Sequence, residues 1–224
     1  MITTINYKGQ EIKFEVTDPD DYLQKFWLRG TFYELGMLQF MEQPWIDKNQ
    51  IHGPVVVDVG ACIGNHTIFF AKCMNAYVYA IEPSPGNMAV LQQNAILNNV
   101  RQSIFPVPKG AGHHRGLARF KKDGSGNCGM GKITADGEDI VDLVPIDQVI
   151  APSHEVDILK IDVEGYNIPV LEGSRNTIEH DHPEIYIECQ TPEELREVEG
   201  FLLPLGYKRW PQHFNATPTY FFYY

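Results

Sequence analysis

Hydrophobic and polar positions divide the chain into two parts near residue 50. Residues 1–50 hold a strand-like segment, EIKFEV, and then apolar residues at the i, i+4, i+7 and i+8 positions of an amphipathic helix: Tyr33, Met37, Phe40 and Met41. From Pro54 onward, short apolar runs alternate with segments of helical period. We expect a single domain over 1–224, with an N-terminal cap at 1–50 and a core at 51–224.

Five apolar runs in the core predict strands. They are VVVDV (55–59), AYVYAIE (76–82), SIFPVP (103–108), VDILKID (156–162) and EIYIEC (184–189). Helical segments follow most of them, and two of these segments open with a capping Ser84 or Thr191 and a proline. YKRW and PTYFFYY predict a closing hairpin. This order predicts an α/β three-layer sandwich whose seven-stranded, mostly parallel sheet ends in a C-terminal antiparallel hairpin.

Residues 109–156 interrupt the alternation of strands and helices. The segment is rich in glycine, and GLARFKK and DIVDLVPI predict an inserted hairpin with a loop able to cover a substrate. Asn127 and Met130 in that loop are expected to contact the substrate. The basic stretch KGAGHHRGLARFKK (109–122) is interpreted as a solvated face of the hairpin.

Composition and charge narrow the possible partners. The formal net charge of −11 disfavours nucleic acid as the main partner. The four cysteines form no CxxC pair, so they are interpreted as reduced thiols. No apolar run approaches the ~20 residues of a membrane helix. The first residues also resemble no targeting sequence, so a cytoplasmic location without membrane association is expected.

The stretch VVVDVGACIGNHT (55–67) has the composition of a ligand loop that follows a first strand. Its spacing, Asp58-x-Gly60-x-x-x-Gly64, differs from the GxGxxG of dinucleotide folds. Glu82 ends the next strand, where a carboxylate can accept hydrogen bonds from both ribose hydroxyls. Either S-adenosylmethionine (SAM) or NAD has such a ribose, so this carboxylate leaves the cofactor open.

The segment DILKIDVEGYNIPVLEGS (157–174) carries a resemblance to a known family. Together with VDVGACIGNHT, IEPSPGNMAVLQQNAILNN, VPIDQVI and PEIYIEC, it resembles the FkbM family of SAM-dependent methyltransferases from about Phe32 to Cys189. GTFYE (30–34) also looks like the segment that often precedes the core in this family. The resemblance implies a class I Rossmann-like fold and methylation of a hydroxyl, often on a sugar or a glycosylated small molecule.

The resemblance also assigns cofactor residues. Those expected at the methionine end of SAM are Asp58, Gly60, Ala61 and Gly64, with Asn65 and Thr67 in support, and Glu82 is expected to hold the ribose. Two positions depart from the family pattern. Cys62 stands where asparagine is common, and Asn167 replaces a frequent acidic residue.

Methyl transfer to a hydroxyl needs a positioned acceptor and a base. Asp162 is the first candidate for base or acceptor-orienting residue and Glu164 the second, although either carboxylate could instead fix the turn that they occupy. His113 is a weaker candidate beside His114. Glu188 is expected to contact the substrate. It could join Asp162 in a Mg²⁺ site, but the sequence does not support a metal.

Two alternatives to a carbohydrate O-methyltransferase stay open. An NAD-dependent oxidoreductase shares the fold and the ribose-binding acid, but the chain lacks GxGxxG and an evident Tyr-x-x-x-Lys relay. A SAM-binding module without activity would keep the same glycine loop.

Overall fold

A seven-stranded sheet forms the centre of the computed structural model, which describes residues 1–46, 53–122, 128–129 and 131–224. Its strand order is β12-β13-β11-β10-β3-β4-β5. The parallel strands are β3 (Val55–Val59), β4 (Tyr77–Ile81), β5 (Ile104–Val107), β10 (Ile158–Ile161) and β11 (Glu184–Glu188). β12 (Lys208–Phe214) and β13 (Thr219–Tyr223) form the antiparallel hairpin. The predicted fold class is confirmed.

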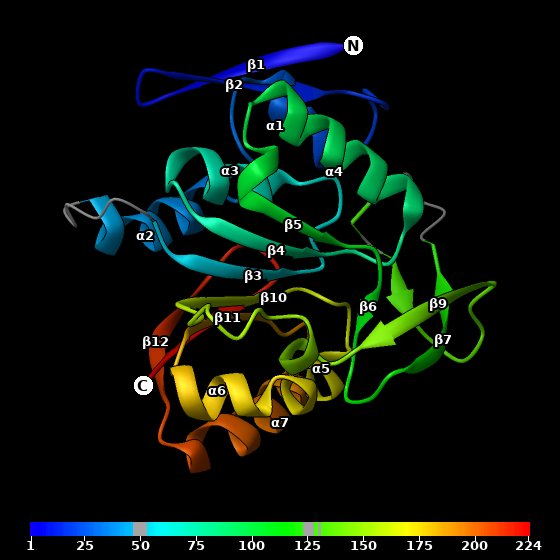
Figure 1. Cartoon of the computed structure of the whole chain (residues 1–224), viewed down its shortest axis with the longest axis vertical. Coiled ribbons are helices and arrows are strands. Elements are labelled where there is room, and N and C mark those ends of the chain that lie inside the picture. Colours follow the sequence, from blue (N-terminus) through cyan, green and yellow to red (C-terminus); the bar gives the residue numbers. More distant parts are fainter. Residues whose placement is uncertain (47–52, 123–127, 130) are drawn as a thin grey trace.

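Helices cover both faces of this sheet (Figure 1). α2 (Leu35–Ile46), α3 (Asn65–Cys73) and α4 (Pro85–Leu97) lie on one side, and α5 (Asn167–Gly173), α6 (Arg175–Asp181) and α7 (Pro192–Leu202) lie on the other. Short 3₁₀ turns lie at Arg101–Ser103, Ile146–Gln148 and Leu203–Leu205. Alternate residues of a strand point to opposite faces of the sheet. Val56 therefore packs in the hydrophobic core on one face, and Val57 packs in the core on the other.

The N-terminal region contains more structure than the sequence predicted. β1 (Ile2–Tyr7) pairs antiparallel with β2 (Gln10–Glu15), and α1 (Gln24–Leu28) follows. Two buried asparagines, Asn94 of α4 and Asn98 directly after its last turn, attach this hairpin to the core. Asn98 accepts from Lys13 N at 2.9 Å and donates to Lys13 O at 2.7 Å, while Asn94 accepts from Glu15 N at 2.8 Å. An amide side chain therefore bonds the outer edge of β2 as a strand would.

The inserted region forms a second sheet rather than a simple hairpin. The predicted strands are β7 (Gly116–Lys121) and β9 (Asp139–Val144), which pair antiparallel, and β6 (Gly110–Ala111) and β8 (Lys132–Ile133) complete the order β6-β9-β7-β8. The connection from β5 to β6 is only two residues long, which places this sheet beside the carboxyl ends of the parallel strands (Figure 1).

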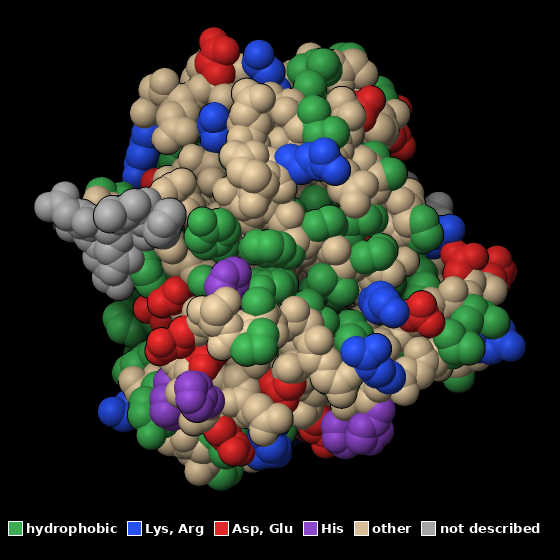
Figure 2. All heavy atoms as spheres, viewed as in Figure 1, with side chains coloured by type: hydrophobic (Ala, Val, Ile, Leu, Met, Phe, Trp, Pro, Cys, Tyr) green, Lys and Arg blue, Asp and Glu red, His purple; other side chains and the backbone are tan. Residues whose placement is uncertain are grey.

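Three lysines of the inserted region are paired with acidic residues. Lys109 lies 3.5 Å from Asp142, Lys121 lies 2.7 Å from Asp136, and Lys122 lies 2.8 Å from Asp139. On the face shown in Figure 2, blue and red side chains of this region lie next to each other. This arrangement fits the interpretation of 109–122 as a solvated face. Among the described helices, none combines the length and apolar character needed to cross a membrane.

We expect Asn94→Ala to lower the free energy of unfolding by about 2–3 kcal/mol, because it leaves the buried backbone groups Glu15 N and Ile63 O without their partner. Gln93→Ala on the exposed side of α4 is the matched control. Urea unfolding followed by circular dichroism measures both variants. Equal stability of the two variants would contradict the role given to Asn94.

Candidate active site

The loop after β3 approaches the end of β10 so closely that Gly60 admits no side chain. Its φ is +77°, and a Cβ placed there would lie 1.9 Å from the backbone oxygen of Asp162. Gly64 has a φ of +91°, and its Cβ would lie 3.0 Å from Leu91 Cγ. The two glycines thus let the loop turn sharply and bring the ends of β3 and β10 together.

Glu82 lies at the carboxyl end of β4 and is 5% exposed. One carboxylate oxygen accepts from Cys62 N at 2.9 Å and the other accepts from Ser84 N at 2.7 Å. Burial raises the pKa of Glu82 to about 7, although the two N–H groups act in the opposite direction. The carboxylate lines a cavity, here called the Glu82 cavity, together with Gly60, Asn87, Ala111 and Phe120.

Cys62 occupies the turn between Gly60 and α3 with a φ of +47°, which is unusual for a residue with a side chain. Its Sγ lies 3.2 Å from Sγ of Cys128, a residue of the inserted region, and this contact with burial raises the pKa of Cys62 well above its ordinary value. The backbone of Cys128 is held by Asp21, which accepts from its N–H at 2.9 Å, and by Asn87, which donates to its carbonyl at 3.0 Å. The loop and the inserted region therefore meet at the Glu82 cavity.

Lys160 of β10 links three groups of the site. Its Nζ lies 3.1 Å from Asp58, 3.4 Å from Asp162 and 3.3 Å from the carbonyl of Gly60. Burial alone would lower the pKa of Lys160, but the two carboxylates raise it above its ordinary value. Asp58 is fully buried, and Thr67 donates to it at 2.6 Å. Asp58 and Thr67 thus hold the strand and helix in place and line neither cavity.

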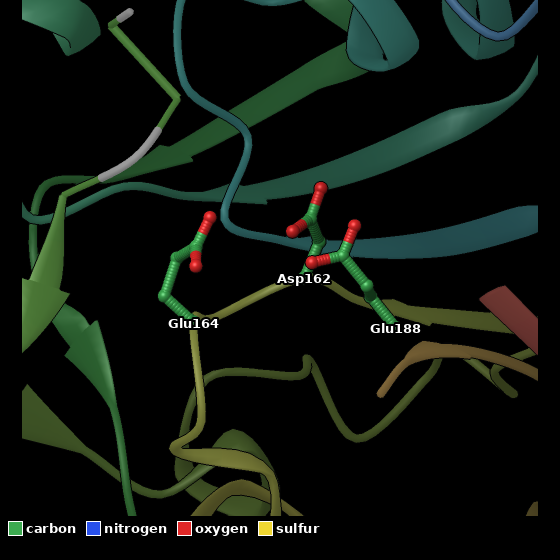
Figure 3. A group of neighbouring side chains, drawn as sticks. All are labelled: Asp162, Glu164 and Glu188. Carbon is green, nitrogen blue, oxygen red and sulfur yellow. The ribbon is translucent and has the colours of Figure 1, made fainter. Parts of the chain in front are cut away.

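Three carboxylates gather where β10 and β11 end. Oxygens of Asp162, Glu164 and Glu188 lie within 4.8 Å of one another, and Figure 3 shows the side chains of Asp162 and Glu188 next to each other with Glu164 beside them. Glu164 has a φ of +49° and accepts a hydrogen bond from Gln190. Burial raises the pKa of Glu188 to about 8, and the charges of Asp162 and Glu164 add to that effect.

The three carboxylates bear on whether this site could bind a metal ion. Carboxylate oxygens are the ligands that Mg²⁺ prefers, and the three residues have the type and spacing for such an ion. The sequence had brought only Asp162 and Glu188 together, and Glu164 is the third candidate ligand. Two of the three carboxylates, however, already have partners in Lys160 and Gln190.

The acidic group opens into a cavity of about 300 Å³, here called the Glu188 cavity. Its aromatic and polar walls come from the N-terminal region, the loop after β3, and the ends of β10 and β11: Tyr22, Tyr33, Ala61, Asn65, His66, Lys160, Asp162, Glu164, Glu188 and Gln190. Gly60, Cys62, Gly129 and Asp162 line both this cavity and the Glu82 cavity. The two cavities are therefore neighbours across the Gly60 turn.

The predicted site residues fall into two groups. Gly60, Ala61, Glu82, Asp162, Glu164 and Glu188 line one or both cavities. Asn65 reaches the Glu188 cavity, but its side chain accepts from Trp27 Nε1 at 2.9 Å and from Tyr33 N at 3.1 Å, and donates to Tyr33 O at 3.0 Å. Its amide therefore fastens the N-terminal region to α3.

Four predicted residues that the structure describes line neither cavity: Asp58, Gly64, Thr67 and His113. His113 stacks on His114 at 3.7 Å and lies 3.2 Å from Glu172. Asn127 and Met130 lie outside the described residues, so their expected contact with a substrate stays a prediction. Asn167, the departure from the family pattern, donates to the carbonyl of Glu188 at 2.7 Å and links α5 to β11.

The sequence analysis missed the contribution of the N-terminal region to the site. Tyr33 and His66 line the Glu188 cavity, and Glu34 lies behind His66 at 3.1 Å. Tyr33 and Glu34 belong to the segment GTFYE, whose similarity to the family segment was the available signal. Their position above the cavity depends on how the N-terminal region packs, which no local pattern reveals.

The chain is similar to known proteins in sequence and in fold. A hexuronic acid methyltransferase, AglP of Haloferax volcanii, is 27% identical over 128 residues, and the chain spans 52% of that relative's length while 56% of this chain is covered. In fold, the chain is similar to an FkbM methyltransferase of Methylobacillus flagellatus, with a TM-score of 0.61 and 22% identity over 77% of this chain and 44% of that one.

A SAM-dependent O-methyltransferase of Thermotoga maritima also has a similar fold, with a TM-score of 0.52 and 10% identity over 98% of this chain and 76% of that chain. The methyltransferase FkbM domain matches residues 58–209, a span that runs from the Asp58 of the glycine loop through both acidic strand ends. The chain belongs to the FkbM methyltransferase family.

Proposed function

We propose that this protein transfers the methyl group of SAM to a hydroxyl of a carbohydrate acceptor. The observation that carries the proposal is the pairing of two cavities across the Gly60 turn, one with a buried ribose-type carboxylate and one with an acidic group. A methyl donor in the first and an acceptor in the second would meet beside Asp162, which lines both.

The residues that line the Glu82 cavity suit the adenosine half of SAM. Each carboxylate oxygen of Glu82 already accepts one backbone N–H and retains lone pairs for a ribose hydroxyl. The backbone of Gly60 lies beside it without a Cβ, and the apolar side chains of Ile81 and Phe120 offer contacts to a base. Bound SAM would supply an electrophilic methyl group, and the protein would position an oxygen against it.

The first turn of α3 argues against NAD as the ligand. In dinucleotide folds the pyrophosphate lies at the N-terminus of this helix. Here Asn65 and Thr67 in that turn are almost fully buried, and the Asn65 side chain is occupied by Trp27 and Tyr33. The Asn65 amide in that turn is therefore not available to a phosphate.

The Glu188 cavity fits a polyhydroxylated acceptor. Carboxylates and the Gln190 amide can accept or donate hydrogen bonds to sugar hydroxyls, and Tyr22 and Tyr33 offer ring surfaces for the apolar face of a sugar. Asp162 is the proposed base or acceptor-orienting residue, with Glu164 the second candidate. The similarity to a hexuronic acid methyltransferase supports a carbohydrate acceptor, but it does not assign the particular sugar.

Calorimetric titration tests the cofactor half of the proposal. We expect saturable binding of S-adenosylhomocysteine and none of NAD. Binding of NAD alone would overturn the proposal, and methyl transfer from labelled SAM to none of a panel of sugars and glycosides would overturn the carbohydrate acceptor.

We expect the affinity for S-adenosylhomocysteine to rise with pH through the neutral range. The pKa of Glu82 is raised to about 7 by burial, and the ionised carboxylate is the form that accepts two ribose hydroxyls. Protonation at low pH should therefore weaken binding, with a dissociation constant about tenfold larger at pH 6 than at pH 8. Calorimetry at pH 6, 7 and 8 measures it.

Two variants assign this pH dependence. Glu82→Gln should bind more weakly and lose most of the dependence on pH, while Asp142→Asn, at an exposed ion pair of the inserted sheet, should retain it. A dependence that survives Glu82→Gln would remove Glu82 as its source.

We expect Asp162→Asn to lower methyl transfer by at least about tenfold while leaving S-adenosylhomocysteine affinity nearly unchanged, because an amide cannot take the acceptor proton. Asp142→Asn, at an exposed ion pair of the inserted sheet, is the control and should keep its activity. Single-turnover assays with labelled SAM compare the two. Unchanged turnover in Asp162→Asn would remove this residue as the base.

Activity is expected to survive dialysis against EDTA. Lys160 lies 3.4 Å from Asp162, and Gln190 donates to Glu164, so two of the three carboxylates have protein partners without an ion. Turnover before and after dialysis, with and without added Mg²⁺, checks this expectation. A loss of activity that Mg²⁺ restores would assign the three carboxylates to a metal instead.

A further inference from the structure

The amino-acid end of SAM has no obvious partner among the residues that the sequence assigned to it. Asp58 is fully buried and already pairs with Lys160 and Thr67. The Asn65 amide is occupied by Trp27 and Tyr33. If the ribose lies at Glu82 and the sulfonium near Asp162, the amino-acid end extends past Ala61 into the Glu188 cavity.

His66 is a buried polar side chain at the Glu188 cavity. It follows Asn65 in the first turn of α3, lines the Glu188 cavity and is only 6% exposed. Its Nε2 lies 3.1 Å from Glu34, yet it has no directed hydrogen bond among the described residues. A buried ring nitrogen without a directed hydrogen bond costs free energy.

Glu34 holds the imidazole from behind. Its side chain is as buried as that of His66, and its backbone takes a left-handed φ of +57° that aims it at the ring. Burial alone would raise the pKa of Glu34, but His66 and Lys160 keep that pKa below its ordinary value. Since Nε2 faces this carboxylate, the ring nitrogen left for a ligand is Nδ1.

We infer that the Glu34–His66 pair recognises the amino-acid end of SAM, with the His66 imidazole donating to the ligand carboxylate and Glu34 acting as the positioning residue. This inference rests on the proposed function. The Glu34 carboxylate fixes the ring orientation through one ring nitrogen. In the imidazolium form both ring nitrogens donate, so the second N–H is the donor to the ligand carboxylate. The ligand ammonium then lies near the carboxylates that line the same cavity, whose sign suits it.

Two ligands isolate the amino-acid end. S-adenosylhomocysteine carries it, while 5′-methylthioadenosine has the adenosine and sulfur without it. Both are titrated by calorimetry into the wild-type protein, His66→Phe, Glu34→Gln and the control His213→Phe, which alters an exposed histidine of β12. Phenylalanine keeps a ring beside Phe70, on which His66 stacks, but removes both N–H groups.

We expect His66→Phe to weaken S-adenosylhomocysteine binding by about tenfold or more, the effect of losing a hydrogen bond to a charged group. Affinity for 5′-methylthioadenosine should change by less than about twofold, since the adenosine contacts remain. Glu34→Gln should lower the preference for S-adenosylhomocysteine in the same direction but by less. His213→Phe should match the wild type with both ligands.

The outcomes separate this inference from the proposed function. Equal weakening of both ligands in His66→Phe would show a structural role and overturn the inference, as would an unchanged preference. Wild-type protein that binds neither ligand would overturn the proposed cofactor itself. Binding of 5′-methylthioadenosine also reports that a variant has folded with an intact adenosine cavity.

Discussion

The buried ion pair between Asp58 and Lys160 is the interaction on which the rest of the site depends. The two residues face each other in the parallel register of β3 and β10, and their charged atoms lie 3.1 Å apart. Loss of one partner from such a pair costs about 3–5 kcal/mol because the other is left charged and buried. Lys160 also reaches Asp162 and the carbonyl of Gly60, so a single cation fixes both the glycine turn and the proposed base.

Three residues with a strained backbone lie around the same point. Glu34, Cys62 and Glu164 each have a positive φ, although none is glycine. They come from three separate segments, and each lies at the cavities or directly behind a lining residue. Such conformations persist only where the surrounding structure enforces them, and they are found at ligand sites more often than elsewhere. Here the strain aims side chains that a relaxed loop would turn toward solvent.

The N-terminal region is part of the site rather than a cover for the core. Trp27 and Tyr33 are fastened to α3 through Asn65, and this contact places Tyr33 at the Glu188 cavity and Glu34 behind His66. The same segment reaches the inserted region, because Asp21 accepts from the backbone of Cys128. Two sequence-distant regions thus close the cavities from opposite sides of the Gly60 turn.

The sequence alone determined the sheet, the glycine loop and the acidic strand ends. Apolar runs, capping residues and the Gly60 and Gly64 spacing are local signals, and the parallel order places Glu82, Asp162 and Glu188 at one edge. Only the tertiary structure decided which polar groups stay free for a ligand. Asp58, Asn65 and Thr67 match the expected motif, but each already has a side-chain partner. Asp58 pairs with Lys160, Asn65 accepts from Trp27, and Thr67 donates to Asp58. His66 has no motif of its own and faces the cavity, because hydrogen-bond occupancy depends on distant segments that no local pattern encodes.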